Sequence, residues 1–99
     1  MSELSQEIFR EELPNFRSIC LTVKEDCSVK LDTQDMGETV RRTWGDSDYE
    51  FWLDVPCTEA KKLLFALLRD KYSNISDSVD QFKNFCETNG IKCEWDSYI

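Results

Sequence analysis

Carboxylates are the side chains of this chain best placed to do chemistry, and they gather in one stretch. Between Thr43 and Ala60 there is no Lys or Arg, and the acids are Asp46, Asp48, Glu50, Asp54 and Glu59. Paired carboxylates act as general acid and base when burial or a cleft sets their pKa values apart. Exposed acids that alternate along a strand lack that setting. The stretch therefore favours a surface that attracts cations, although a run of charge often marks only a solvated face.

The rest of the chain carries no catalytic or metal-binding signature. There is no histidine, and the five cysteines form no C-x-x-C pair, so a zinc site of common spacing is excluded. A nucleophilic cysteine also needs a nearby base, usually histidine. A Gly-rich phosphate loop and a G-x-S-x-G motif are missing as well. We expect no catalytic residue, metal or cofactor, and interpret the cysteines as free thiols that pack as small hydrophobes.

Trp52 changes the interpretation of the acidic stretch. Residues 48–55 alternate between apolar and polar with the period of a half-buried strand, so Trp52 shares the polar face with Glu50 and Asp54. A large aromatic among carboxylates indicates a surface that another molecule covers, unless a helix or the N-terminal segment covers it within the monomer. Tyr98 repeats the pattern near two acids. The candidate partner-binding residues are Asp46, Asp48, Glu50, Trp52, Asp54 and Tyr98.

The strand that carries Trp52 is one of several alternating segments. Residues 16–24 and 27–32 predict an antiparallel hairpin that turns at Glu25-Asp26. In residues 48–55 the core face is expected to hold Tyr49, Phe51, Leu53 and Val55. Residues 91–98 also alternate and predict a last strand.

Two segments have apolar residues at helical spacing. The first is rich in leucine and runs from an N-cap at Thr58 to about Lys71. The second begins with a capping box at Ser78 and Gln81 and ends before Gly90. The segments together predict an α+β fold, an antiparallel sheet of about four strands with two helices packed on one face.

The pattern is least distinct in residues 1–15 and 35–44. Residues 3–13 fit a short helix that ends before Pro14. Residues 38–44 fit either a helical turn or a strand, because their apolar positions are too few to separate the two periods. The sequence leaves the structure of both stretches open.

The bulk properties limit the class of protein. A chain of 99 residues supports one domain with a two-layered core. Its net charge of −8 repels phosphates and anionic lipids and attracts cationic partners. No signal-peptide pattern and no apolar run near the ~20 residues of a membrane span is present. We expect a cytoplasmic monomer or weak dimer that does not bind nucleic acid or membranes directly.

Four stretches carry a pattern shared with a known class of proteins. They are Phe9-Arg10-Glu11-Glu12-Leu13-Pro14, Trp44-Gly45-Asp46-Ser47-Asp48-Tyr49-Glu50, the leucine-rich helix, and Asn89-Gly90-Ile91 to Trp95. In these stretches the chain resembles the small acidic immunity proteins that bacteria encode beside polymorphic toxins, including contact-dependent growth inhibition systems. The resemblance covers most of the chain, but Asp26-Cys27 stands where an Asp-Gly turn is expected. Members of this class differ in structure, so no binding residue is carried over.

The resemblance implies that residues 1–99 form a single toxin-binding domain without enzymatic activity. The implied partner is a cognate toxin, often a basic nuclease acting on tRNA, other RNA or DNA, whose active site or substrate surface the protein covers. The charge agrees, since an acidic surface can occupy the Lys and Arg that a nuclease presents to phosphates. Two alternatives stay open. One is an acidic nucleic-acid mimic that inhibits a restriction or CRISPR-type nuclease, with acids in rows over the whole molecule; the other is a cytoplasmic adaptor.

Overall fold

The computed structural model describes residues 3–37 and 48–98. Its elements in chain order are β1 (Leu4–Glu11), β2 (Phe16–Val23), β3 (Val29–Met36), β4 (Asp48–Val55), the 3-10 helix η1 (Cys57–Glu59), α2 (Ala60–Tyr72) and α3 (Ser78–Thr88). A four-stranded antiparallel sheet and two helices confirm the predicted α+β class. The chain divides into two compact units, the sheet unit (Met1–Lys62) and the helical unit (Leu63–Ile99). A single domain with helices packed on the sheet therefore stays a prediction.

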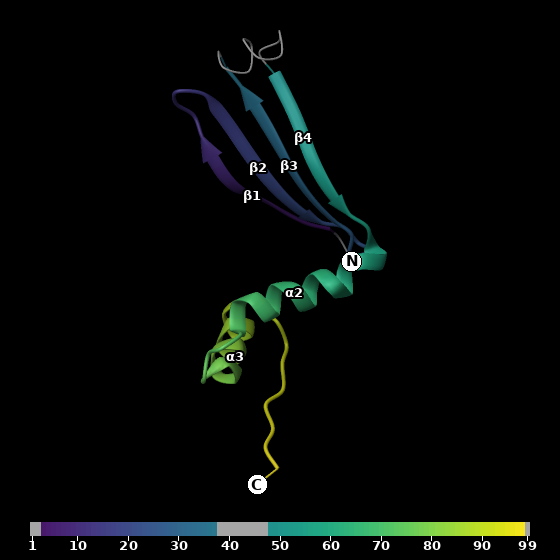
Figure 1. Cartoon of the computed structure of the whole chain (residues 1–99), viewed down its shortest axis with the longest axis vertical. Helices are drawn as coiled ribbons and strands as arrows, with labels where there is room; N and C mark the ends of the chain where they lie inside the picture. The colour runs from purple at the N-terminus through teal and green to yellow at the C-terminus, as the bar shows by residue number, and fades with distance from the viewer. Residues whose placement is uncertain (1–2, 38–47, 99) are drawn as a thin grey trace. The chain divides into compact units, whose positions relative to one another are not determined.

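The four strands lie side by side in chain order, each antiparallel to the next (Figure 1). β1 and β4 are therefore the outer strands, with β2 and β3 between them. The predicted hairpin of β2 and β3 is confirmed. At its turn Cys27 has a φ of +70°, a conformation usual for glycine, and Asp26 Oδ1 accepts a hydrogen bond of 2.9 Å from the Ser28 N–H.

Cross-strand register gives the sheet two chemically different faces. The apolar face holds, from β2, β3 and β4, Ile19, Leu21, Val23, Val29, Leu31, Thr33, Tyr49, Phe51, Leu53 and Val55, and at one end Arg17 and Asp35, which form an ion pair at 2.6 Å. The polar face holds Phe16, Ser18, Cys20, Thr22, Lys30, Asp32, Gln34, Met36, Glu50, Trp52 and Asp54. Directly opposed residues point to the same side of a sheet, so the division predicted for residues 48–55 is confirmed.

The sheet unit does not bury its apolar face by itself. Tyr49 and Val55 are half-buried, whereas Phe51 is 40% and Leu53 67% exposed, so the expectation that all four are core residues stays a prediction that depends on a second layer. β4 is an outer strand with a neighbour on one side only. A single sheet also cannot cover its own faces and needs a second layer to bury them.

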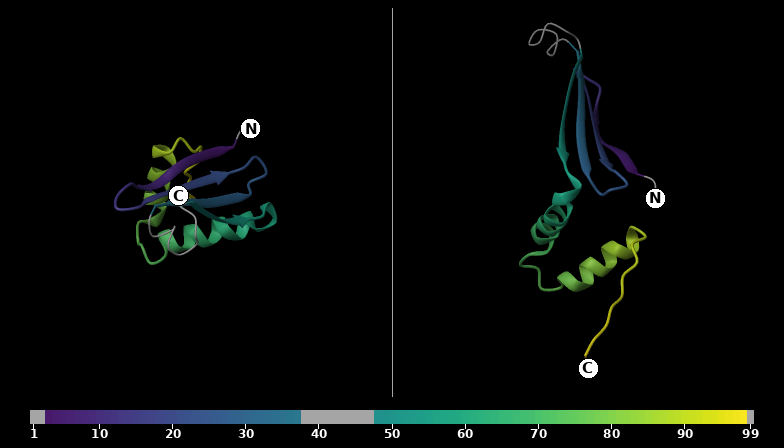
Figure 2. Two further views of the ribbon diagram at one scale, coloured as in Figure 1. Left: turned by 90° about the horizontal axis from the view of Figure 1, so that it is seen from above. Right: turned by 90° about the vertical axis from the view of Figure 1, so that its right-hand side faces the viewer.

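Both ends of the chain differ from the sequence-based expectation. Residues 4–11 form β1 instead of a helix, and the β1–β2 register shifts between Glu7 and Phe9. The shift is a β-bulge, which interrupts the period of two. At the other end of the chain, residues 91–98 form no strand. They continue from the end of α3 as an extended segment (Figure 2). Alternation alone does not make a strand, because a strand also needs a neighbour for its backbone hydrogen bonds.

The helices start at other residues than predicted. Thr58 lies inside η1, after Pro56, and does not cap α2. The N-cap of α3 is Asp77, and Gln81 Nε2 donates to its Oδ1 over 2.9 Å, so the cap lies one residue before the predicted Ser78. Within the helical unit the rings of Tyr72 and Phe82 pack with centroids 5.3 Å apart. Among the described residues no helix is long and apolar enough to cross a membrane.

Candidate partner-binding surface

The register of β3 and β4 gathers charged side chains around Trp52. Asp32 lies directly opposite Trp52, and Lys30 lies opposite Asp54. Glu50 and Asp54 flank Trp52 on the same strand, two residues away on either side. The acidic patch, defined here as Lys30, Asp32, Glu50, Trp52 and Asp54, is thus one continuous area of the polar face.

Trp52 is the largest side chain of the acidic patch, and 57% of it is exposed. The Lys30 ammonium lies 5.1 Å from its ring centroid, within the range of a cation–π interaction. This contact is worth only about 0.5–1 kcal/mol at an exposed site. Lys30 therefore orients the indole, and most of the Trp52 ring stays exposed within the sheet unit.

The carboxylates of the acidic patch are not used within the protein. Glu50 and Asp54 are exposed, and Asp32 is half-buried. Across the described parts of the chain, none of the three carboxylates forms a side-chain hydrogen bond or an ion pair. They are available to cationic groups of a partner.

Glu7 lies on the same face of the sheet but on the other outer strand, β1, and it is already paired. Its carboxylate accepts a hydrogen bond from the Ser18 hydroxyl and forms an ion pair with Arg10 at 3.0 Å. The hydrogen bond from Ser18 has the largest effect on the pKa of Glu7, and with Arg10 it holds this pKa below its usual 4.5, against a smaller opposing effect of burial. Among the described residues, the unpaired acids of the polar face thus concentrate on β3 and β4.

The structure brings together three of the six candidate binding residues: Glu50, Trp52 and Asp54. Asp48 begins β4 opposite Met36, and Asp46 lies outside the described residues. Tyr98 is fully exposed but belongs to the helical unit, so the sheet does not position it.

Sequence reasoning missed Lys30 and Asp32. The signal was present, since both occupy polar positions of the predicted strand at 27–32. The pairing of β3 with β4 could not be predicted, because the sequence of residues 38–44 between them fits either a helical turn or a strand.

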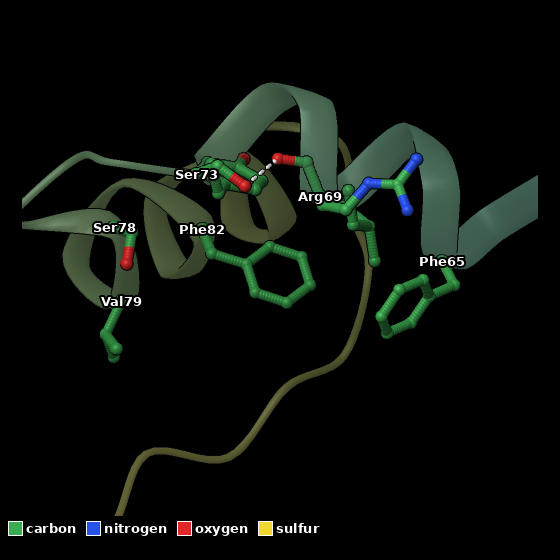
Figure 3. A pocket seen from close by; sticks show the side chains of 8 residues that line it. Phe65, Arg69, Ser73, Ser78, Val79 and Phe82 are labelled. Carbon is green, nitrogen blue, oxygen red and sulfur yellow. Dashed lines mark hydrogen bonds between the residues drawn. The ribbon is translucent and has the colours of Figure 1, made fainter.

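The helical unit contains a second concave surface, a groove of about 470 Å³ between α2 and α3. Phe65 of α2 and Phe82 and Val79 of α3 line it, and the Ser73 hydroxyl donates to the Arg69 carbonyl at 2.6 Å (Figure 3). Its lining is mainly apolar, and Arg69 is the one charged residue among the eight that form it. The groove has no acid–base pair and no nucleophile beside a base.

No group of three or more Cys, Asp or Glu suited to a metal ion occurs in residues 3–37 and 48–98. Comparison of the chain with protein-family models, with curated proteins and with solved structures finds no match to any of them. The acidic patch is therefore judged on its own chemistry: an exposed aromatic side chain among carboxylates that form no ion pair with the residues that the structure describes.

Proposed function

We propose that this protein is an immunity protein that binds a cognate bacterial toxin, a basic nuclease, and neutralises it by covering its active site or substrate-binding surface. The observation that carries the proposal is the exposed Trp52, which lies between Glu50 and Asp54 and opposite Asp32. Tryptophan is enriched among residues that dominate binding energy, and carboxylates bind cations. The two together fit a protein surface rich in Lys and Arg.

A nuclease offers such a surface because its substrate is a polyanion. Its Lys and Arg must face the phosphates, and the carboxylates of the acidic patch can take the place of those phosphates. An arginine of the toxin can stack on the Trp52 ring, either on the side away from Lys30 or by displacing Lys30. Inhibition is then steric and electrostatic and needs no chemical step.

The charge of the whole chain supports fast capture of such a toxin. A protein of net charge −8 attracts a basic partner, and steered association reaches about 10⁸ M⁻¹ s⁻¹ or more at low salt. A high association rate matters for a protective protein, because a free nuclease molecule cleaves many substrate molecules until it is bound.

The arrangement of charge favours a protein partner over mimicry of nucleic acid. A mimic needs acids in regular rows at phosphate spacing. In the acidic patch the row is interrupted by Lys30 and Trp52, and at β1 Arg10 pairs with Glu7. A mixed surface with an aromatic anchor is typical of protein interfaces.

The direct test uses the toxin domain that the proposal expects to be encoded immediately upstream of the gene for this protein. The purified domain is assayed on tRNA, other RNA and DNA while this protein is added in increasing amounts. We expect nuclease activity to disappear at a one-to-one ratio, and cells that make the toxin domain to survive only when they also make this protein.

An unrelated acidic protein of equal net charge serves as the control and should leave the nuclease active. Full toxin activity in a tenfold excess of this protein would contradict the proposal. The absence of any toxin gene beside this one would contradict it as well.

A further inference from the structure

The chain reverses direction after α3, and the reversal brings residues 91–93 back toward the helix. Gly90 has a φ of +68°, the Ile91 N–H donates to the Cys86 carbonyl at 2.8 Å, and the Gly90 N–H donates to the Glu87 carbonyl at 3.2 Å. This pair of hydrogen bonds defines a Schellman motif. The segment after Gly90 therefore runs back beside the last turn of α3, where Cys86 lies.

Cys86 and Cys93 meet as a result of this reversal. Both line one cavity of about 280 Å³, together with Trp95. Cys86 is buried, with 5% exposed, whereas Cys93 is exposed, and both are free thiols. Burial has the largest effect on the pKa of the Cys86 thiol and raises it. Cys93, which hydrogen-bonds to this thiol, and the nearby Glu87 raise the pKa further. An accessible thiol thus lies against a shielded one.

We propose that Cys86 and Cys93 form a reversible modification site, at which low-molecular-weight disulfides such as oxidised glutathione convert the two thiols into an intramolecular disulfide. The site lies within the helical unit and does not rest on the proposed immunity function. The charged residues that line the cavity are Lys83, Lys92 and Glu94.

The reaction is an ordinary pair of thiol–disulfide exchanges. The Cys93 thiolate attacks one sulfur of oxidised glutathione, forms a mixed disulfide and releases one glutathione thiolate. The Cys86 thiolate then attacks the Cys93 sulfur, forms the Cys86–Cys93 disulfide and releases the second. The protein loses two thiol protons and two electrons, and one molecule of oxidised glutathione becomes two of reduced glutathione.

The disulfide changes the surface of the helical unit. It joins the segment after Gly90 covalently to α3 and encloses residues 87–92 in a short loop. Trp95, which is 60% exposed and lines the same cavity, is then held near α3. Oxidation would thereby fix a segment that hydrogen bonds and packing alone hold in the reduced protein.

The test uses the full-length reduced protein, oxidised glutathione as the probe, and thiol counting with peptide mapping by mass spectrometry. We expect a peptide that links Cys86 to Cys93 and carries no glutathione, glutathione adducts only on other exposed thiols such as Cys27 and Cys57, and recovery of all five thiols after addition of reduced glutathione. Cys93→Ser should lose the linked peptide and leave Cys86 unmodified. Cys86→Ala should hold one glutathione stably on Cys93.

Cys57→Ser is the matched control, because Cys57 is an exposed thiol in the sheet unit, and it should leave the linked peptide unchanged. Circular dichroism checks that Cys86→Ala folds, and the exposed Cys93→Ser keeps the test valid if it does not. Three results would overturn the proposal: a stable glutathione adduct on Cys93 of the unaltered protein, a disulfide between another pair, or equal formation of the Cys86–Cys93 link in denaturant.

Discussion

The two faces of β4 can be compared through adjacent residues, Trp52 and Leu53. Both side chains are exposed, at 57% and 67%, but their cross-strand neighbours on β3 differ. Trp52 lies opposite Asp32 with the Lys30 ammonium over its ring, whereas Leu53 lies opposite Leu31. Exposure alone therefore does not distinguish the two positions, whereas the residue directly opposite each of them does.

The comparison implies different consequences of mutation on the two faces. The apolar face can be covered by any well-fitting apolar layer, and its residues should contribute to folding. The polar face carries, in Asp32, Glu50 and Asp54, carboxylates that form no ion pair within the described part of the chain, and we expect these residues to contribute to binding. Variants matched across the two faces test this division.

The largest effect is expected from Leu31→Ala on the central part of the apolar face. Leu31 has strand neighbours on both sides, Leu21 and Leu53, and its truncation removes apolar contacts to both. Because Leu31 is still 39% exposed, the free energy of unfolding should fall by about 2 kcal/mol, the low end of the range for Leu→Ala, measured by chemical denaturation. Leu31→Met keeps the volume and should change it by less than about 1.5 kcal/mol. An unchanged denaturation midpoint in Leu31→Ala would show that this face contributes nothing to folding.

The next effect is expected from Trp52→Ala. Loss of an anchoring tryptophan should weaken toxin binding by about 2 kcal/mol, or roughly 30-fold, and change the free energy of unfolding by less than about 0.5 kcal/mol. Titration calorimetry and denaturation of the same preparation measure both. If Trp52→Ala instead unfolds as readily as Leu31→Ala, the indole is packing within the protein and the acidic patch loses its anchor.

A smaller effect is expected from the double substitution Glu50→Lys and Asp54→Lys. Reversing two exposed charges should slow toxin association about tenfold at low salt, with little change in the thermal midpoint. Glu3→Lys with Asp70→Lys changes the net charge equally at exposed sites outside the acidic patch and is the matched control. Equal slowing by both pairs, measured by stopped flow, would mean that total charge matters and the patch does not.

The smallest effect concerns Glu7, the paired acid of the polar face. Its pKa is lowered in the folded protein, so its contribution to stability is present above the usual 4.5 and is lost as the pH falls through the lowered value. Ser18→Ala removes the largest cause and should move the pKa of Glu7 upward toward 4.5. An NMR titration of the Glu7 carboxyl carbon measures this, and an unchanged midpoint in Ser18→Ala would refute the assignment.

Sequence patterns predicted the elements that follow one period without interruption. The alternation in residues 48–55 gave both the extent of β4 and the position of Trp52 on its polar face. The leucine-rich segment and Gly90 likewise predicted α2 and the end of α3. In these stretches local preference and tertiary structure agree.

The failures have physical causes in particular residues. The bulge between Glu7 and Phe9 leaves Leu4, Ile8 and Phe9 at a spacing that also fits a helix, so β1 was missed. Residues 91–98 alternate but pair with no strand in the described part of the chain. Cross-strand partners such as Asp32 depend on register, which no pattern within a single strand determines.

The bulge in β1 also bears on how copies of this protein meet at high concentration. It breaks the regular ladder at one outer strand, whereas β4 pairs with β3 without a shift and presents a regular outer ladder. A second copy adding to β4 would bring its Glu50 and Asp54 near the same carboxylates of the first. One edge is thus protected by geometry and the other by repulsion, and salt weakens only the repulsion. Crowded molecules in high salt would then join β4 to β4 as closed pairs and not as growing fibres, because β1 cannot extend the chain of strands.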